Sequence, residues 1–319
     1  MRPDPIDSRG FLGNQFAKGF VAISEMNAHS KIGRWILAAR PKTLWAAVGP
    51  VIVGTAMAFE SGAGAWLPAL TALLGAVAIQ VGTNLANDYY DCQKGADRED
   101  RLGPVRVTQA GLISPAVMRR AIAITFAIAG AAGLYLIYRG GWPIAVIGVL
   151  SILSGILYTA GPYPLGYIGL GDIFVLIFFG PVAVAGTYYV QALSMEPSVL
   201  LAGLSPGFFS VAILAVNNLR DMDSDAKSGK KTLAVRFGEQ FARMEYLFSI
   251  LSASLIPVIL FAYDKAHPWS LLAIMVPLAG FNAIKTVFST SGPVLNDVLA
   301  ATGKLLLLFS ILFSVGWLL

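Results

Sequence analysis

The sequence predicts an all-α, polytopic membrane protein with about nine transmembrane helices. Of its 319 residues, 56% are hydrophobic and only 13% are charged, whereas soluble domains carry about 25% charged residues. A mean hydropathy of +0.69 agrees with lipid as the surrounding solvent. Strands of an outer-membrane barrel would alternate apolar and polar residues over shorter segments, and the sequence shows no such alternation.

Each predicted span is an apolar run close to the roughly 20 residues that cross a bilayer as a helix. The runs lie near residues 43–60, 66–86, 117–138, 142–160, 170–190, 198–218, 244–263, 268–288 and 299–319. Residues 1–30 are mixed in character and predict a disordered or surface-lying tail. A single membrane domain is therefore expected over residues 31–319, beginning with a short amphipathic helix in "KIGRWILAARPK" at the membrane interface.

The positive charges predict how the chain is oriented. If the N-terminus is cytoplasmic, all 23 Lys and Arg residues except Arg139 and Lys265 fall on the cytoplasmic side. Such an excess in cytoplasmic loops sets the orientation of membrane proteins, and we expect an inner (cytoplasmic) membrane protein. The bias also accounts for the pI of 9.3, so a nucleic-acid partner is not expected. The single cysteine, Cys92, excludes an internal disulfide and any multi-cysteine metal site.

Two acidic motifs follow the second and sixth spans, "NLANDYYDCQKGAD" and "NNLRDMDSD". In each motif, one asparagine and two of the three aspartates are spaced by three or four residues and therefore share a helix face. These are Asn84, Asp88 and Asp91 in the first motif and Asn217, Asp221 and Asp225 in the second. Four spans separate the motifs, so both stripes face the cytoplasmic half of the membrane. Asp223, two positions from each aspartate of its stripe, is expected to point away.

Solvated interface residues would explain one such motif but not two with the same Asn-xxx-Asp spacing. Like charges at this spacing repel, and ionisable groups at membrane depth are usually functional. Carboxylate and amide oxygens suit Mg²⁺, which binds through one or two carboxylates plus substrate phosphates. Two stripes predict two ions, with nearby Lys and Arg gripping a diphosphate. The substrate expected is a lipid diphosphate, whose departing diphosphate the metals would stabilise.

These motifs resemble those of the UbiA superfamily of intramembrane prenyltransferases. Its two signatures appear as "NDYYD" from Asn87 and as "DMDSD" from Asp221. The blocks "RPKTL", "KGAD", "RLGPVRVTQAG" and "NNLRDMDSDAKSGKKTLAVRFG" resemble the branch that acts on 1,4-dihydroxy-2-naphthoate in menaquinone synthesis. Many superfamily members place a third acidic residue where this chain has Gly95. Here Asp97 follows two positions later, and this Gly-x-Asp form resembles the naphthoate branch.

The resemblance implies a helical bundle around a central cavity that opens sideways to lipid. It implies Mg²⁺-dependent transfer of a polyprenyl group from a polyprenyl diphosphate to the naphthoate ring. The prenyl chain would replace the ring carboxylate, releasing CO₂ and diphosphate and giving a demethylmenaquinone.

The resemblance also assigns roles to residues. It makes Asp88, Asp91, Asp221 and Asp225 catalytic metal ligands and adds Asn84 and Asp97 as candidate ligands; the spacing adds Asn217. Expected diphosphate contacts are Lys94, Arg101, Arg106, Lys230 and Lys231, although positive-inside anchoring explains the same charges. Acceptor or cation contacts are expected from Arg40, Lys42, Tyr158, Tyr163 and Tyr167. For the tyrosines, an aromatic belt at the interface is the alternative.

Two other functions fit parts of the sequence. A related prenyltransferase would act on another aromatic acceptor, such as 4-hydroxybenzoate, homogentisate or a chlorin; "RPKTL" and "GPVRVTQAG" argue against it. A cation transporter would use the aspartates as an ion pathway. The basic loops beside both motifs argue against that, because phosphate-binding residues hinder the entry of cations.

The orientation gives a first prediction. Single cysteines placed in the loops around residues 100 and 230, in a chain without Cys92, should resist a membrane-impermeant thiol reagent applied from the periplasmic side. They should react once the membrane is permeabilised. Labelling of those loops from the periplasmic side alone would contradict the charge argument.

Overall fold

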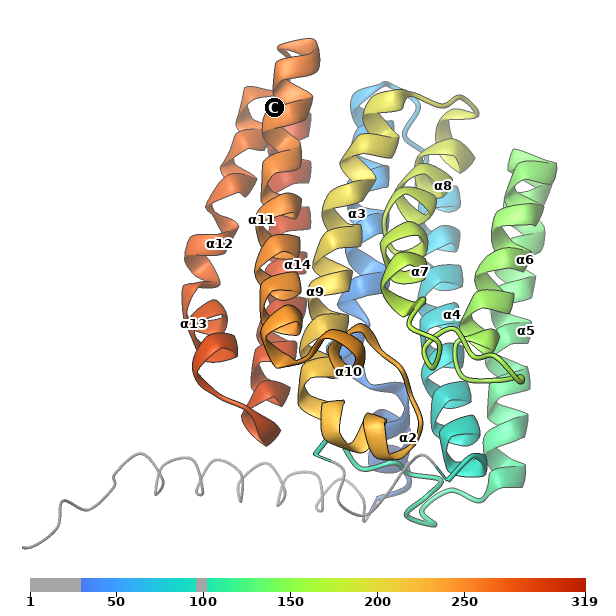
Figure 1. Cartoon of the computed structure of the whole chain (residues 1–319). Coiled ribbons are helices and arrows are strands. Elements are labelled where there is room, and N and C mark those ends of the chain that lie inside the picture. Colours follow the sequence, from blue (N-terminus) through green and yellow to red (C-terminus); the bar gives the residue numbers. More distant parts are fainter. Residues whose placement is uncertain (1–29, 96–101) are drawn as a thin grey trace, which may run out of the picture.

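The computed structural model describes residues 30–95 and 102–319, and every regular element within those ranges is a helix (Figure 1). The first half contains α2 (Lys31–Ala39), η1 (Pro41–Thr43), α3 (Trp45–Glu60), α4 (Trp66–Gln93), α5 (Pro115–Gly140), α6 (Trp142–Leu157), α7 (Gly171–Phe178) and α8 (Pro181–Ala192). The second contains α9 (Pro197–Lys227), α10 (Leu233–Phe237), α11 (Glu239–Asp264), η2 (Pro268–Met275), α12 (Val276–Ala279), α13 (Phe281–Ser289), η3 (Gly292–Val294) and α14 (Leu295–Leu318). The predicted tail lies outside the described ranges except for Ser30.

The predicted all-helical membrane fold is confirmed, with an approximate span count. Seven helical segments of the described chain are long and apolar enough to cross a membrane. The count is eight if Lys31–Thr43 and Trp45–Glu60, bent by 52°, form one span. The span predicted at 142–160 is α6, an apolar helix of only 16 residues. The runs at 170–190 and 268–288 are each broken into shorter helices.

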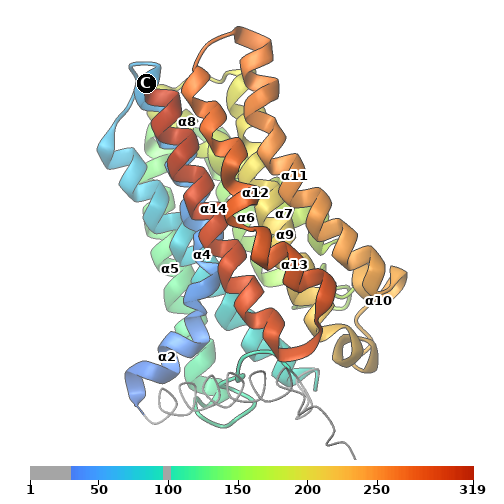
Figure 2. The same cartoon turned by 90° about the vertical axis from the view of Figure 1, so that its left-hand side faces the viewer.

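The helices stand side by side, and α9 lies at the centre of the bundle (Figures 1 and 2). In the most apolar stretch of α9, 72% of residues are buried, against 17% in α5 at the periphery. The main core joins α3, α8, α9, α11 and α14 through large buried side chains such as Tyr188, Phe209, Ile250 and Phe309. The second acidic motif therefore sits at the end of the most enclosed helix, and the first at the end of α4.

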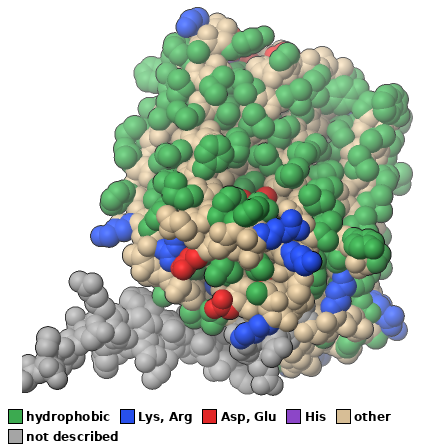
Figure 3. Space-filling view, viewed as in Figure 1, with side chains coloured by type: hydrophobic (Ala, Val, Ile, Leu, Met, Phe, Trp, Pro, Cys, Tyr) green, Lys and Arg blue, Asp and Glu red, His purple; other side chains and the backbone are tan. Residues whose placement is uncertain are grey.

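The surface is divided as a membrane protein requires. Hydrophobic side chains cover most of the face in Figure 3, and Lys and Arg gather mostly toward its lower end, where α4 and α9 finish. At that end α2 is an amphipathic helix, as expected. Ser30 caps it by accepting a hydrogen bond from the Gly33 N–H at 2.8 Å, and Ile32 is 75% exposed. This arrangement suits a helix lying in the interface.

The break between α7 and α8 depends on glycines. A Cβ at Gly180 would lie 2.4 Å from the Leu176 carbonyl oxygen and 2.8 Å from that of Gly203. Gly203 is equally restricted, because its Cβ would lie 2.7 Å from Pro181 Cα. The broken span can therefore approach α9 only where neither backbone carries a side chain.

This close approach gives a second prediction. Gly180→Ala should lower the Tm of the purified protein by several degrees, because the added methyl group overpacks the contact between two backbones. Gly130→Ala is the matched control, since its Cβ would meet nothing within 4 Å and alanine favours helix. Thermal unfolding in one detergent compares them; equal Tm values for the two variants would contradict the packing argument.

Candidate active site

A polar cavity lies where α4 and α9 end, with about 470 Å³ of space free of protein atoms, open solvent included. Its lining comes from both acidic motifs, from the loops that follow them, from the loop between α6 and α7, and from Arg40 at the start of η1. The lining residues with charged, amide or phenolic side chains are Arg40, Asn87, Asp91, Arg106, Tyr158, Tyr167, Asn217, Asn218, Asp221, Asp225 and Lys230. The fold therefore brings together residues from distant parts of the chain at one end of the bundle.

On α4, the residues that line this cavity are Asn87 and Asp91, which are four positions apart. Asp91 is 1% exposed and accepts hydrogen bonds from Arg106 Nη2 at 2.9 Å and from the Tyr167 hydroxyl at 2.8 Å. The Lys230 ammonium is 3.5 Å from the same carboxylate. Asn87 accepts from the Thr159 hydroxyl at 2.9 Å. Sequence reasoning missed Asn87 as a site residue, although its spacing to Asp91 was a usable signal.

The other two members of the expected first stripe face elsewhere. Both carboxylate oxygens of Asp88 accept buried backbone hydrogen bonds, from the N–H of Val107 at 3.0 Å and of Thr108 at 2.9 Å. The Asn84 amide donates to the Ala39 carbonyl at 2.9 Å and to the Thr43 hydroxyl at 3.0 Å. Neither Asp88 nor Asn84 lines the polar cavity.

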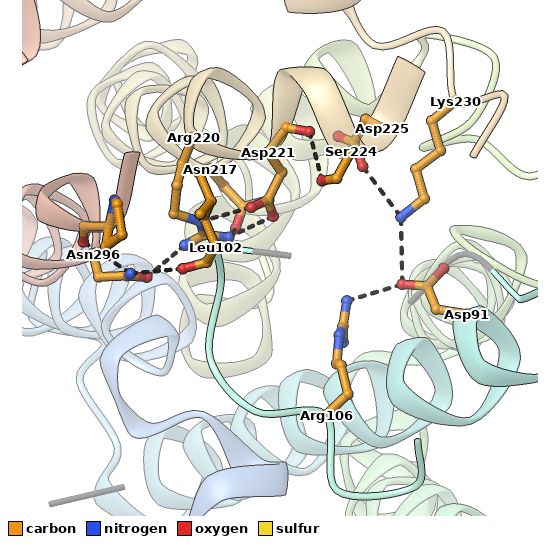
Figure 4. Close-up of polar contacts among 11 residues, drawn as sticks. Asp91, Leu102, Arg106, Asn217, Arg220, Asp221, Ser224, Asp225, Lys230 and Asn296 are labelled. Atoms are coloured by element: carbon orange, nitrogen blue, oxygen red, sulfur yellow. Dashed lines mark hydrogen bonds and ion pairs between the residues drawn. The ribbon is translucent and has the colours of Figure 1, made fainter. Parts of the chain in front are cut away.

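On α9, the whole expected stripe lines the cavity: Asn217, Asp221 and Asp225. Asp223 is exposed and outside the lining, as the helical period predicts. Arg220 holds this stripe (Figure 4). It donates to both oxygens of Asp221, at 2.8 and 2.6 Å, and to the Asn217 side-chain oxygen at 2.8 Å.

A second contact of Arg220 reaches α14. Its Nη1 donates to the Asn296 side-chain oxygen at 2.8 Å, and the Asn296 amide donates to the Leu102 carbonyl at 3.2 Å. From the sequence, Arg220 is expected only as a cytoplasmic positive charge, and no sequence pattern indicates a role for Asn296. Both are buried, with exposures of 4% and 6%, so these contacts tie the loop after the first motif to the second motif.

Among the predicted basic residues, Lys230 lies between the two motifs. Its ammonium is 3.5 Å from Asp91 and 3.6 Å from Asp225 (Figure 4). Lys94 instead donates to the Thr159 carbonyl at 2.7 Å and to the Gly161 carbonyl at 3.0 Å. Partial burial lowers the pKa of Lys94, against the opposing effect of Asp91.

Of the other predicted residues that the structure describes, Arg40, Tyr158 and Tyr167 line the cavity, and Lys42, Lys231 and Tyr163 do not. Lys231 is exposed, and Lys42 is outside the lining, within electrostatic reach of Asp297. Tyr163 is 78% exposed. Tyr167 faces the polar cavity, with the ammonium groups of Lys94 and Lys230 at 4.8 and 4.9 Å from its ring centre. Asp97 and Arg101 lie outside the described residues.

A larger, mainly apolar cavity lies beside the polar one among α3 to α9. It holds about 2200 Å³ of space free of protein atoms, open solvent included. Four residues line both cavities: Arg40, Asn87, Tyr158 and Asn217. Burial first, and nearby carboxylates second, raise the pKa of the Tyr158 phenol, so that it stays protonated at neutral pH. These four shared residues form the junction between a charged cavity and a hydrocarbon-like one.

The donor set fits Mg²⁺ shared with a phosphate ligand. Within the described ranges, no three His, Cys, Asp or Glu side chains are close enough to hold a metal ion by themselves. The carboxylates are divided, with Asp91 on α4 and the pair Asp221 and Asp225 on α9. Mg²⁺ needs only one or two carboxylates when substrate phosphates complete its ligands, and every donor here is an oxygen.

Comparison with known proteins identifies the family. Residues 47–296 match the UbiA prenyltransferase family. The chain belongs to this family. The family indicated by the motifs is thereby confirmed, and the protein is a multi-pass integral membrane protein.

Curated members of the family align with almost the whole chain. It is 40% identical over 295 residues to a protein of Escherichia coli K12 named 1,4-dihydroxy-2-naphthoate octaprenyltransferase, covering 90% of this chain and 96% of that one. A Haemophilus influenzae protein of the same name is 37% identical over 303 residues, covering 92% and 98%. A solved structure of a UbiA homologue from Archaeoglobus fulgidus, bound to GPP and Mg²⁺, has a TM-score of 0.67 and 16% identity, covering 89% and 99%. At that identity it supports the fold alone.

Proposed function

We propose that the protein transfers a polyprenyl group from a polyprenyl diphosphate to 1,4-dihydroxy-2-naphthoate. The reaction releases CO₂ and diphosphate and gives a demethylmenaquinol, the hydroquinone form of a demethylmenaquinone. The active site faces the cytoplasm from the cytoplasmic membrane, because the polar cavity lies at the end of the bundle where positive charges gather. The names of the E. coli and H. influenzae relatives support the acceptor.

The observation that carries this proposal is the meeting of the two cavities. A polyprenyl diphosphate has a highly charged head and a long hydrocarbon tail, joined at one carbon. The polar cavity offers cations and carboxylates, and the adjoining cavity of about 2200 Å³ is mainly apolar. A molecule that fills both places its reacting carbon at the junction, beside Tyr158 and Arg40.

The head group fits the polar cavity if Mg²⁺ accompanies it. Asp91 with Asn87, and Asp221 with Asp225 and Asn217, would hold the ions on opposite sides of the diphosphate. When bound, Mg²⁺ neutralises the negative charge that builds on the departing diphosphate. Arg106 and Lys230 contact Asp91 directly and are placed to donate to the phosphate oxygens instead.

The atoms and electrons of the proposed reaction balance as follows. The bond between C1 of the prenyl chain and the bridging oxygen breaks, and its electron pair leaves with diphosphate. The ring carbon that carries the carboxylate attacks C1, forming the new carbon–carbon bond. The carbon–carboxylate bond then breaks, CO₂ departs, and that electron pair restores the aromatic ring. This replacement consumes one carboxylate and produces one CO₂, so no further proton is needed.

The junction residues suit the reacting centre. The neutral phenol of Tyr158 presents a π face and a hydroxyl group without introducing a competing nucleophilic anion. Arg40 carries a guanidinium suited to bidentate contact with a carboxylate, which makes it our candidate for orienting the acceptor. The apolar lining beyond them excludes water that would otherwise capture an allylic cation.

A direct assay tests the function. Purified protein with Mg²⁺, 1,4-dihydroxy-2-naphthoate and a series of prenyl diphosphates should give a product whose mass shows gain of the prenyl group and loss of CO₂. Excess chelator should abolish turnover, and Mn²⁺ should restore it. Product from 4-hydroxybenzoate or homogentisate but not from the naphthoate would refute the acceptor. Full turnover in chelator would refute the metal.

The second motif offers a matched set of variants. Asp221→Asn and Asp225→Asn should each lower kcat by about a hundredfold or more, because each removes a charge that holds a metal against the leaving group. Asp223→Asn, on the exposed face of the same helix, should keep most of its activity. Turnover of the three purified variants at saturating Mg²⁺ distinguishes them. Three mild effects would mean that neither Asp221 nor Asp225 holds a metal during the reaction.

A further inference from the structure

The end of α4 carries two pairs of polar residues with different contacts. Asn87 and Asp91 line the polar cavity, while Asn84 and Asp88 form a second i, i+4 pair one helical step away. Asp88 lies about 100° from Asn87 around the helix, and its carboxylate contacts the loop after α4 and does not line the cavity. We propose that Asn84 and Asp88 are positioning residues, which set the two arginines Arg40 and Arg106 at the site, and that neither binds metal. This inference deepens the proposed prenyl transfer and rests on it.

Asp88 fixes the segment that carries Arg106. Its two oxygens accept from the N–H groups of Val107 and Thr108, the residues that directly follow Arg106. Asp88 is 1% exposed, and Val107 is fully buried in a small core cluster with Leu85. Arg106 leaves this anchored turn to reach Asp91 at 2.9 Å. The position of the guanidinium is therefore set by a carboxylate that does not touch it.

Asn84, one turn before Asp88 on α4, does the same for Arg40. Its amide donates to Ala39 and Thr43, the residues on either side of the break between α2 and η1. Arg40 lies at that break with φ 52° and ψ 68°, a left-handed conformation that non-glycine residues rarely adopt. Such a backbone persists only where surrounding contacts enforce it. The Asn84 amide provides two of those contacts, and Arg40 lines both cavities.

A metal-binding role for Asp88 conflicts with these contacts. Its carboxylate would have to turn from two backbone N–H groups that are buried beside it. Those groups would then lack acceptors, which costs free energy in a buried setting. Asn84 lines the apolar cavity and not the polar one where the other oxygen donors meet. Asn87 and Asp91 already supply the oxygen donors of α4 to that cavity.

Hydrogen exchange on the unmodified protein gives a test that needs no turnover. The amides of Val107 and Thr108 should stay protected from deuterium exchange to the same degree without metal, with Mg²⁺, and with Mg²⁺ plus farnesyl diphosphate. If Asp88 binds metal, adding Mg²⁺ takes the carboxylate away and both amides exchange faster. Such a loss of protection would overturn the proposal for Asp88.

Crossed double-mutant cycles test both arginines together. Asp88→Asn and Arg106→Ala should each weaken binding of farnesyl diphosphate roughly tenfold or more. Their combination should cost little beyond either alone, because Asp88 acts through Arg106. Asn84→Asp, which removes the donor and keeps the shape, should be coupled to Arg40→Ala in the same way. Arg40→Ala should change either the Kd of farnesyl diphosphate or the KM of the naphthoate. The coupling between Asn84→Asp and Arg40→Ala should appear in that same constant.

The crossed pairs provide the matched controls. Asp88→Asn with Arg40→Ala, and Asn84→Asp with Arg106→Ala, should be additive. The Mn²⁺ affinity of Asp88→Asn should equal that of the unmodified protein, whereas that of Asp91→Asn should fall. A fall in Mn²⁺ affinity for Asp88→Asn, additivity within the direct pairs, or unaltered constants for Arg40→Ala would each overturn the corresponding half of the proposal. Absence of prenyl transfer by the unmodified protein would instead refute the proposed function, while exchange and Mn²⁺ affinity still decide the role of Asp88.

Discussion

The site depends on the pairing of buried carboxylates with cations. Asp91, Asp221 and Asp225 are 1%, 2% and 7% exposed. A buried charge without a partner costs on the order of several kcal/mol. Each of these carboxylates contacts a cation: Asp91 has Arg106 and Lys230, Asp221 has Arg220, and Asp225 has Lys230. Because Lys230 contacts carboxylates from both motifs, the same pairing that stabilises each aspartate also holds the two sides of the cavity together.

The cations differ in how tightly they are held, and this difference matters for the proposed reaction. Arg220 is enclosed by Asn217, Asp221 and Asn296, and its planar guanidinium satisfies all three at once. Lys230 has longer contacts, of 3.5 and 3.6 Å, and its side chain is 14% exposed. We therefore expect Lys230 to move to an entering diphosphate and Arg220 to stay with its helix. Metal ions arriving with that diphosphate would replace the positive charge that Lys230 withdraws from Asp91 and Asp225.

Helix positions were predictable because the length of an apolar run is a local property, whereas the direction of a helix face is not. Asn84 with Asp88 and Asn87 with Asp91 have the same i, i+4 spacing, so spacing alone could not decide which pair faces the cavity. That choice depends on how α4 is rotated against its neighbours. The α9 motif left less ambiguity, since Asn217, Asp221 and Asp225 form one continuous stripe. The contact between Asn296 and Leu102 joins residues 194 positions apart. No local sequence pattern predicts a contact at that separation.

The two polar pairs of α4 also explain why so many polar residues lie at one helix end in an apolar protein. A metal and diphosphate site needs few ligands, but it also needs fixed cations, and Arg40 and Arg106 stand on short irregular segments. Such segments have little regular hydrogen bonding of their own to hold them. Buried side chains on a rigid helix can supply the missing partners, as Asn84 does for Ala39 and Asp88 does for Val107. The last turns of α4 therefore serve both purposes, with one pair of polar residues lining the cavity and the other holding the segments that carry Arg40 and Arg106.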